Sequence, residues 1–436
     1  MSGLLRICTA GNVDDGKSTL IGRMLHDSQG VYEDQVHSVR AASANRGAGP
    51  IDFSLFTDGL KAEREQGITI DVAYRYFATS RRKFILADTP GHEQYTRNMA
   101  TGASTADVAI LLVDARHGVR AQSKRHARIA RLLGISDFVV AVNKMDLVDF
   151  DRDVFDSICE HFDQMLVGAR YHAIPLSALN GDNVITLSDK TPWFEGPPLL
   201  EYLETVNVTR DLTALPFRFP VQLVLRPNDS FRGYAGQIES GIVRVGDRVA
   251  AWPSGRTTRI TRIVTHDGDL DMAFAPMSVT LTLDDEIDIS RGDQLSGVAS
   301  PPHVASRFEA EVVWMDERPL DPKRVYLLKH TTRTVSAEVN QGLVLNQIGA
   351  ATISTARPLL FDRYADNRTT GSFILIDPAT CFTAGAGMIT NAIQGDVTAG
   401  ERTPLSAAER LALAARRAGS DAEAIEAVSR ALEEIL

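Results

Sequence analysis

The first half of the chain alternates short apolar runs with segments whose apolar residues recur at helical spacing. One such run is Phe138-Val139-Val140-Ala141-Val142, and residues 20–25 follow a helical pattern. This alternation is typical of a parallel sheet with helices on both faces. We therefore predict an α/β domain over residues 1–208. Its strands are expected at residues 4–10, 71–78, 83–88, 107–114, 137–143 and 171–177.

The pattern changes after Pro216 to short apolar runs interrupted by Gly and Asp, as in residues 241–247. Turn signals at intervals of about ten residues are typical of β-barrels. The pair Pro301-Pro302 interrupts the pattern and predicts two barrels. We place the barrels at residues 215–300 and 305–398, after a linker around residues 205–215.

Two segments lie outside this regular pattern. Residues 404–436 are predicted to form a short helical tail, because Ser406–Glu409 and Ser420–Glu423 both have the form of a capping box. The apolar stripe of its second helix fits packing on its own barrel or, alternatively, binding of a partner. Residues 27–62 are mostly polar with little periodicity, and so long a loop in a compact domain is usually functional or mobile.

The first chemical motif follows the first predicted strand. Residues 11–18 match G-x-x-x-x-G-K-[S/T], the phosphate-binding loop of nucleoside triphosphatases. Its glycines let successive amide N–H groups point at a polyphosphate, while Lys17 reaches the β- and γ-phosphates and Ser18 ligates Mg²⁺. The Asn12 side chain is not needed by this backbone cradle. The candidate residues are Gly11, Asn12, Val13, Asp14, Asp15, Gly16, Lys17, Ser18 and Thr19.

A second motif, D-T-P-G-H, begins where the predicted strand 83–88 ends. Ligands of open α/β sheets bind at the carboxyl ends of strands, so a carboxylate at position 88 is placed to hold Mg²⁺ through water. Gly91 can offer its N–H to a γ-phosphate because no side chain blocks the approach. The candidate residues are Asp88, Thr89, Pro90, Gly91 and His92.

A third motif, N-K-M-D, follows the predicted strand 137–143 and has the form that recognises guanine. The Asp146 carboxylate is expected to accept two N–H bonds that adenine cannot supply, and such a site strongly rejects the analogue lacking them. The run Ser177-Ala178-Leu179 is a fourth, weaker match, and four motifs in this order predict a domain that binds GTP rather than ATP. The candidate residues are Asn143, Lys144, Met145 and Asp146, with Ser177, Ala178 and Leu179 in the loop that closes over the base.

Composition narrows the class of protein. The chain is 44% hydrophobic and 23% charged, as is ordinary for a globular protein. Its net charge of −10 argues against wrapping nucleic acid. Its three cysteines are far apart without a C-x-x-C pair, which favours free thiols in a reducing cytosol. The first strand begins too early for a signal peptide and no run is long enough to span a membrane, so we expect a cytoplasmic protein.

Residues 63–70, E-R-E-Q-G-I-T-I, resemble switch I of translation-factor GTPases of the elongation factor Tu type. In that family a threonine, matched here by Thr69, closes on Mg²⁺ and the γ-phosphate, and the histidine matched by His92 helps to position the attacking water. The family also has a GTPase domain followed by two β-barrels. The resemblance implies catalytic roles for Lys17, Thr69, Gly91 and His92, and Mg²⁺ binding by Ser18, Thr69 and Asp88.

Within this superfamily one branch is favoured, since four runs resemble the GTPase (large) subunit of bacterial ATP sulfate adenylyltransferase. The resemblance implies that GTP hydrolysis drives the uphill synthesis of adenylylsulfate and pyrophosphate from ATP and sulfate. It also implies a heterodimer with a small subunit that carries the ATP and sulfate site. Some members continue into an adenylylsulfate kinase domain, and we expect that activity to be absent because no second phosphate-binding loop occurs. The four runs are residues 66–77, 92–99, 326–335 and 367–377.

Two other interpretations share the nucleotide motifs. The first is an elongation-factor-like GTPase acting in translation, and the branch-specific runs, the acidic balance and the helical tail speak against it. The second is a regulatory GTPase without metabolic coupling, which only the resemblance opposes.

Overall fold

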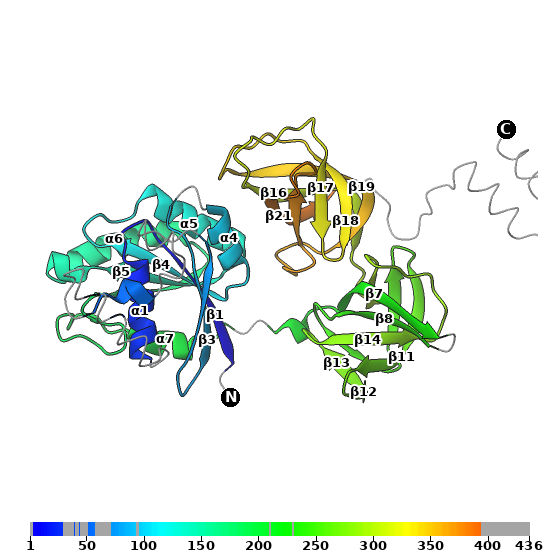
Figure 1. Ribbon diagram of the computed structural model, residues 1–436, viewed down its shortest axis with the longest axis horizontal. Helices are drawn as coiled ribbons and strands as arrows, with labels where there is room; N and C mark the ends of the chain where they lie inside the picture. Colours follow the sequence, from blue (N-terminus) through cyan, green and yellow to red (C-terminus); the bar gives the residue numbers. More distant parts are fainter. Residues whose placement is uncertain are drawn as a thin grey trace, which may run out of the picture. The chain divides into compact units, whose positions relative to one another are not determined.

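The computed structural model describes residues 3–28, 39, 43, 51–56, 71–92, 96–208, 211–228 and 231–393 (Figure 1). The chain divides into two compact units: residues 1–210 with 313–319 and 344–348, and residues 211–312, 320–343 and 349–436. The predicted switch I segment with Thr69 and the predicted tail 404–436 lie outside the described residues.

A six-stranded sheet forms the centre of the first unit, in the order β2-β3-β1-β4-β5-β6 (Figure 1). β2 is antiparallel to β3, and the other neighbouring strands are parallel. The elements are β1 (Leu4–Ala10), α1 (Lys17–Asp27), η1 (Phe53–Phe56), β2 (Ala73–Ala78), β3 (Lys83–Asp88), α4 (Thr96–Ser104), β4 (Val108–Asp114), α5 (Ala121–Leu132), β5 (Asp137–Asn143), η3 (Met145–Val148), α6 (Arg152–Met165), β6 (Arg170–Pro175) and α7 (Leu199–Thr205).

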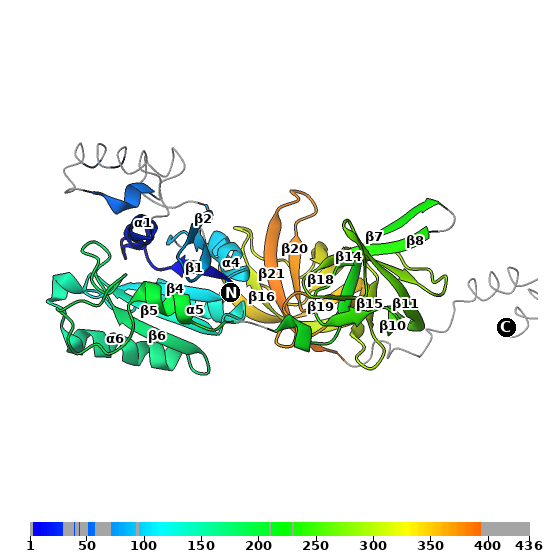
Figure 2. The same cartoon turned by 90° about the horizontal axis from the view of Figure 1, so that it is seen from below.

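Helices cover both faces of this sheet, as the alternating pattern predicts. Leu20 of α1 and Leu203 of α7 pack with Ile7 and Leu86 of the sheet in one buried cluster. α5 contacts α4 and α6, and Figure 2 shows α1 and α6 on opposite sides of the sheet. Because both faces are covered, β4 and β5 are buried along their whole length.

Two β-barrels form the second unit, as the sequence predicts. The first has the order β10-β15-β7-β8-β14-β11, closed by pairing of β10 with β11, and the second is the closed barrel β16-β19-β18-β17-β20-β21. The predicted domain boundaries stay predictions. The elements are η4 (Leu212–Ala214), β7 (Arg218–Asn228), β8 (Phe231–Gln237), β9 (Ile242–Arg244), β10 (Arg248–Trp252), β11 (Arg256–Thr265), β12 (Gly268–Leu270), β13 (Met272–Phe274), β14 (Ser278–Leu283), β15 (Gln294–Gly297), β16 (His303–Trp314), β17 (Tyr326–His330), β18 (Arg333–Val339), β19 (Ile348–Phe361), β20 (Ser372–Ile376) and β21 (Thr383–Ala392).

A buried ion pair joins the two barrels. Arg218 of β7 donates from Nε and Nη2 to the two carboxylate oxygens of Asp362, both at 2.8 Å. Thr370 Oγ1 donates to the same carboxylate at 2.7 Å, and Asn367 Nδ2 donates to Ser240 Oγ at 3.0 Å. Asn367 and Thr370 belong to the N-R-T-T-G run of the sequence, so this run connects the second barrel to the first.

Part of the long polar segment 27–62 packs on the α/β domain. The 3₁₀ helix η1 lies against α1, and Phe53 is buried there. A side chain at Gly22 of α1 would collide with the Phe53 carbonyl, so glycine is required at this crossing. The two aromatic residues Phe53 and Phe56 are the feature of the sequence that indicates packing in this part of the segment.

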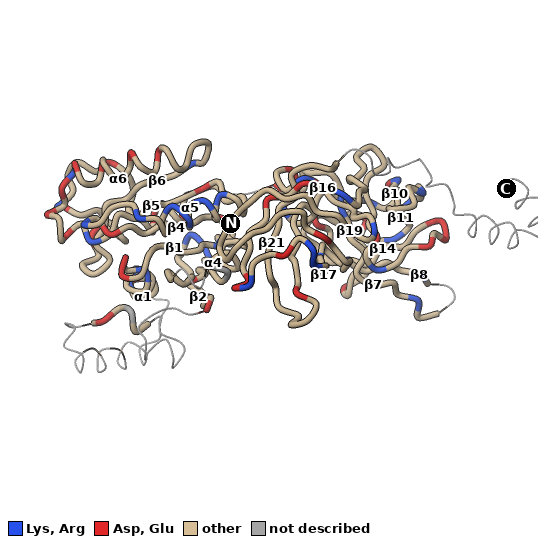
Figure 3. Tube along the Cα trace, turned by 90° about the horizontal axis from the view of Figure 1, so that it is seen from above, with Lys and Arg blue, Asp and Glu red and all other residues tan. Residues whose placement is uncertain are grey.

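The structure shows where the acidic residues and the cysteines lie. Acidic residues recur along α6, where Figure 3 shows them in red. The three cysteines are free thiols, and Cys8 is buried in β1. Among the described helices, none is both long and apolar enough to cross a membrane.

Candidate nucleotide-binding site

The phosphate-binding loop connects the end of β1 to the start of α1. Gly16 is the N-cap of α1 with φ 93°, a left-handed conformation that favours glycine. A side chain on Gly16 would also collide with the Asn143 amide. Two independent constraints therefore require glycine here, and the loop's amide groups gather at the helix N-terminus, where anions bind.

Lys17 lies buried inside this loop. Its Nζ donates to the carbonyl oxygens of Gly11 at 3.0 Å and Asn12 at 2.8 Å. Burial lowers the pKa of Lys17, while the negative charges of Asp88 and Asp15 oppose that shift. Within the described part of the chain Lys17 forms no ion pair, and the groups that its ammonium donates to are the two carbonyl oxygens.

The D-T-P-G-H motif meets the phosphate-binding loop. The buried Asp88 accepts a hydrogen bond from Thr9 Oγ1 at 3.5 Å, and Thr89 Oγ1 donates to the Thr9 carbonyl. Gly91 lies so close to Lys17 Nζ that a Cβ at position 91 would collide with it. Pro90 is buried and His92 half-buried. The structure thus brings Asp88 and Gly91 to the loop.

Asn143 connects three loops of the candidate site. Its Nδ2 donates to the Asp15 carbonyl at 2.8 Å, and its Oδ1 accepts from the Ala178 N–H at 2.9 Å. Lys144 is in the left-handed conformation with φ 61°, and its Nζ donates to the Asp14 carbonyl. The guanine motif is therefore tied both to the phosphate-binding loop and to the loop that begins at Ser177.

The remaining candidate residues differ in exposure. Asp146 is half-exposed, and its carboxylate makes no hydrogen bond to any described residue, which leaves its oxygens available to a base. Met145 is fully buried and contributes packing, whereas Leu179 is 58% exposed. Thr69 lies outside the described residues.

The structure gives the Asn12 side chain a role that the sequence analysis did not expect. Asn12 Nδ2 donates to Asp15 Oδ2 at 2.8 Å and to Ser123 Oγ of α5 at 3.0 Å. The backbone cradle does not need an amide there, but the buried carboxylate of Asp15 does, since a buried charge without partners is unfavourable.

Burial, with Lys17 and Arg125 nearby, lowers the pKa of His126, one turn along α5, to about 3.

Two further residues support the site and were missed from the sequence. Burial raises the pKa of the Asp114 carboxyl, but hydrogen bonds from Arg116 and Lys144 outweigh this and hold the pKa well below its usual range. Arg23 of α1 donates to the Leu179 carbonyl at 3.1 Å and stacks over Phe53. The position of Asp114 at a strand's carboxyl end was an available signal, whereas Arg23 offered none.

Comparison with known proteins agrees with this geometry. Residues 2–206 match the elongation factor Tu GTP binding domain, and residues 340–390 match the GTP-eEF1A C-terminal domain-like family. Over 415 residues the chain is 53% identical to "Sulfate adenylyltransferase subunit 1" of Shewanella oneidensis, covering 89% of this chain and 86% of that protein. The chain belongs to the sulfate adenylyltransferase subunit 1 family.

Two further relatives match over nearly the whole of this chain. The protein of that name from Bacteroides thetaiotaomicron is 51% identical over 442 residues, covering 94% of this chain and 91% of its own length. The "Bifunctional enzyme CysN/CysC" of Mycobacterium tuberculosis is 52% identical over 429 residues, covering 93% of this chain and 69% of its own length. Both resemblances seen in the sequence are confirmed, and the translation-factor alternative is not supported.

Proposed function

We propose that this chain is the GTPase subunit of sulfate adenylyltransferase. GTP hydrolysis on it drives the formation of adenylylsulfate and pyrophosphate from ATP and sulfate. The observation that carries the proposal is the guanine-nucleotide site, in which Asn143 connects the phosphate-binding loop to the loop that begins at Ser177, here called the base loop. The chain that contains this site is 53% identical to a named sulfate adenylyltransferase subunit 1.

The residues of this site have distinct roles in the proposed reaction. Lys17 binds the β- and γ-phosphates, and its burial among carbonyl groups keeps the ammonium in place before nucleotide arrives. Asp146 recognises guanine through its uncommitted carboxylate oxygens. His92 orients the attacking water, and Gly91 donates its N–H to the γ-phosphate. Thr69 is proposed to close on the γ-phosphate, and the sequence alone supports its role.

Mg²⁺ fits the oxygen donors present at the site. The Ser18 hydroxyl makes no hydrogen bond to the described residues, and the Asp88 carboxylate is buried beside the phosphate-binding loop. Hydroxyl and carboxylate oxygens are the ligands that Mg²⁺ prefers. We propose that Ser18 and Asp88 hold the ion, with Thr69 joining them in the GTP state. Bound there, Mg²⁺ would neutralise charge on the β- and γ-phosphates.

A separate small subunit supplies the ATP and sulfate site. The chain has one phosphate-binding loop and one guanine motif, both used by GTP. Coupling then requires an element with two conformations that GTP and GDP favour differently, and the switch segments around Thr69 and Gly91 are the candidates. The assembly we propose is a heterodimer in the cytoplasm.

The test is reconstitution with the small subunit. The purified chain alone should hydrolyse GTP slowly and make no adenylylsulfate. With the small subunit, ATP and sulfate, GTP turnover should rise and adenylylsulfate should form in proportion. Adenylylsulfate made by this chain alone would contradict the division of labour. GTP turnover that does not change when the small subunit is added would favour a regulatory GTPase without metabolic coupling.

A further inference from the structure

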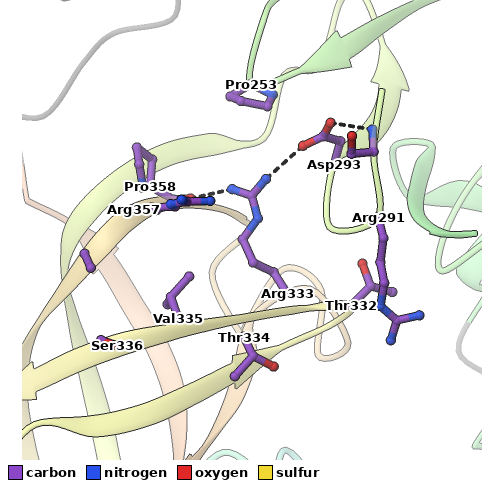
Figure 4. A pocket seen from close by; sticks show the side chains of 12 residues that line it. Pro253, Arg291, Asp293, Thr332, Arg333, Thr334, Val335, Ser336, Arg357 and Pro358 are labelled. Carbon is purple, nitrogen blue, oxygen red and sulfur yellow. Dashed lines mark hydrogen bonds and ion pairs between the residues drawn. The ribbon is translucent and has the colours of Figure 1, made fainter. Parts of the chain in front are cut away.

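A cavity of about 670 Å³ opens between the two barrels of the second unit (Figure 4). The loop before β15 contributes Arg291 and Asp293 from the first barrel, while Arg333 and Arg357 come from β18 and β19 of the second. This volume lies within the range of small-molecule pockets. Three arginines and one carboxylate line it.

The single carboxylate is already used by the protein. Asp293 Oδ1 accepts from Arg333 Nη2 at 2.8 Å, and Asp293 Oδ2 accepts from the Ser290 N–H at 2.9 Å. Arg333 Nη1 donates to the Pro358 carbonyl at 2.7 Å. Figure 4 shows Arg333 extending between Asp293 and Pro358. Arg333 is therefore held in a fixed orientation and connects the two barrels across the cavity.

Among the described residues, neither of the other two arginines forms an ion pair with a carboxylate. Arg291 gives one N–H to the Gln222 carbonyl at 2.9 Å, and the Arg357 guanidinium bonds to none of the described residues. Burial lowers the pKa of Arg333, Asp293 opposes this, and the nearby charge of Arg357 lowers it further. An anion between Arg333 and Arg357 would relieve that repulsion.

Hydroxyl and apolar groups complete the lining. Thr332, Thr334 and Ser336 are also among the lining residues, and the buried Thr332 Oγ1 has no hydrogen-bond partner among the described residues. Pro253 and Val335 add apolar surface. Guanidinium forks and hydroxyls match phosphate oxygens. The apolar surface beside them is compatible with a nucleobase attached to the phosphates.

We propose that this cavity binds the diphosphate or polyphosphate group of a small molecule, at a site separate from the GTP site. A ligand contacting Arg291 and Arg357 together would bridge the two barrels. The site uses the T-T-R-T-V part of the branch-specific run 326–335, to which GTP binding assigns no role.

The test is calorimetric titration of the full chain saturated with GDP and Mg²⁺, so that the GTP site is filled. One arm uses inorganic pyrophosphate and the other uses ATP as probe. We expect saturable binding in at least one arm, weakened about tenfold or more by Arg357→Ala and by Arg291→Ala. Arg363→Ala is the matched control, because it removes an exposed arginine whose partner is Asp366.

The two arms distinguish the sources of the phosphate group. Equal affinity for both probes assigns the site to the diphosphate alone, while tighter ATP binding that the arginine variants also weaken assigns it to a nucleoside polyphosphate. Unchanged melting temperatures of the Arg291→Ala and Arg357→Ala variants would show that both still fold. Two results would overturn the proposal: no saturable binding of either probe, or parent-like binding in the Arg291→Ala/Arg357→Ala double variant.

Discussion

The nucleotide site and the contact between the barrels both bury a cation, and they neutralise it differently. Lys17 is bonded to two carbonyl oxygens, whereas Arg218 is paired in bidentate fashion with Asp362. A buried cation without a bonded carboxylate is costly, and that cost is retained where a ligand's phosphates can supply the negative charge. The comparison separates a cation arranged for binding from one arranged for attachment.

The largest expected effect is at the attachment between barrels. Arg218→Ala leaves the half-buried Asp362 with Thr370 Oγ1 but without its cation, and should lower the free energy of unfolding by about 3 kcal/mol. Urea unfolding of the full chain measures it. Arg363→Ala, which breaks an exposed pair with Asp366, should cost no more than about 1 kcal/mol. Equal small losses in both variants would show that the buried pair does not hold the barrels together.

Lys17→Ala should have the opposite signature. We expect kcat/KM for GTP to fall about a hundredfold or more, since a phosphate-stabilising charge is lost. The melting temperature should fall less than in Arg218→Ala, because the desolvation cost of the cation disappears together with its attraction to Asp88 and Asp15. Lys83→Ala, an exposed lysine on β3, is the control. A destabilised Lys17→Ala protein with normal turnover would reverse our assignment.

Asn143→Ala should affect both properties moderately. The change leaves the Asp15 carbonyl and the Ala178 N–H without their partner, at a cost of about 1–3 kcal/mol in stability. GTP affinity should fall as well, by about tenfold, because the base loop loses its tie to the phosphate-binding loop. Asn180→Ala is the matched control, since its exposed side chain lies in the same loop. Affinity equal to that of the control would contradict the bridging role.

The smallest effect is the pH dependence of stability from His126. Burial lowers its pKa to about 3 from an ordinary value of 6.5, so the folded protein holds it neutral. The contribution of neutral His126 to the free energy of unfolding is fully present above pH 6.5. It is lost as the pH falls, by up to about 1.4 kcal/mol per pH unit. Unfolding of the parent and His126→Gln between pH 5 and about 6.5 should show a shallower slope in the variant. Equal slopes would show that His126 is not buried as a neutral group.

The positions of the candidate nucleotide-site motifs in the fold could be predicted from the sequence because these motifs are local. A left-handed glycine before α1, and polar residues where strands end, follow from short-range backbone geometry and parallel-strand topology. The D-T-P-G-H and N-K-M-D runs therefore lie where we expected them. Thr69 remains a prediction.

The supporting contacts could not be predicted in the same way. Asn12 and Ser123 are 111 positions apart, and Arg218 and Asp362 are 144 apart. Each pair depends on how whole elements pack, which periodicity does not specify. For that reason the role of the Asn12 side chain and the joining function of the N-R-T-T-G run emerge only from the structure.

The most direct test of the proposed coupling is the steady-state ratio of adenylylsulfate and pyrophosphate to ATP and sulfate in the reconstituted heterodimer. If GTP hydrolysis drives the reaction, this ratio with GTP should exceed the equilibrium ratio reached without it. It should return to that equilibrium value when Lys17→Ala replaces the parent chain or when a non-hydrolysable GTP analogue replaces GTP, because binding alone cannot sustain an uphill reaction. The same final ratio with and without GTP, reached only faster with it, would contradict energetic coupling.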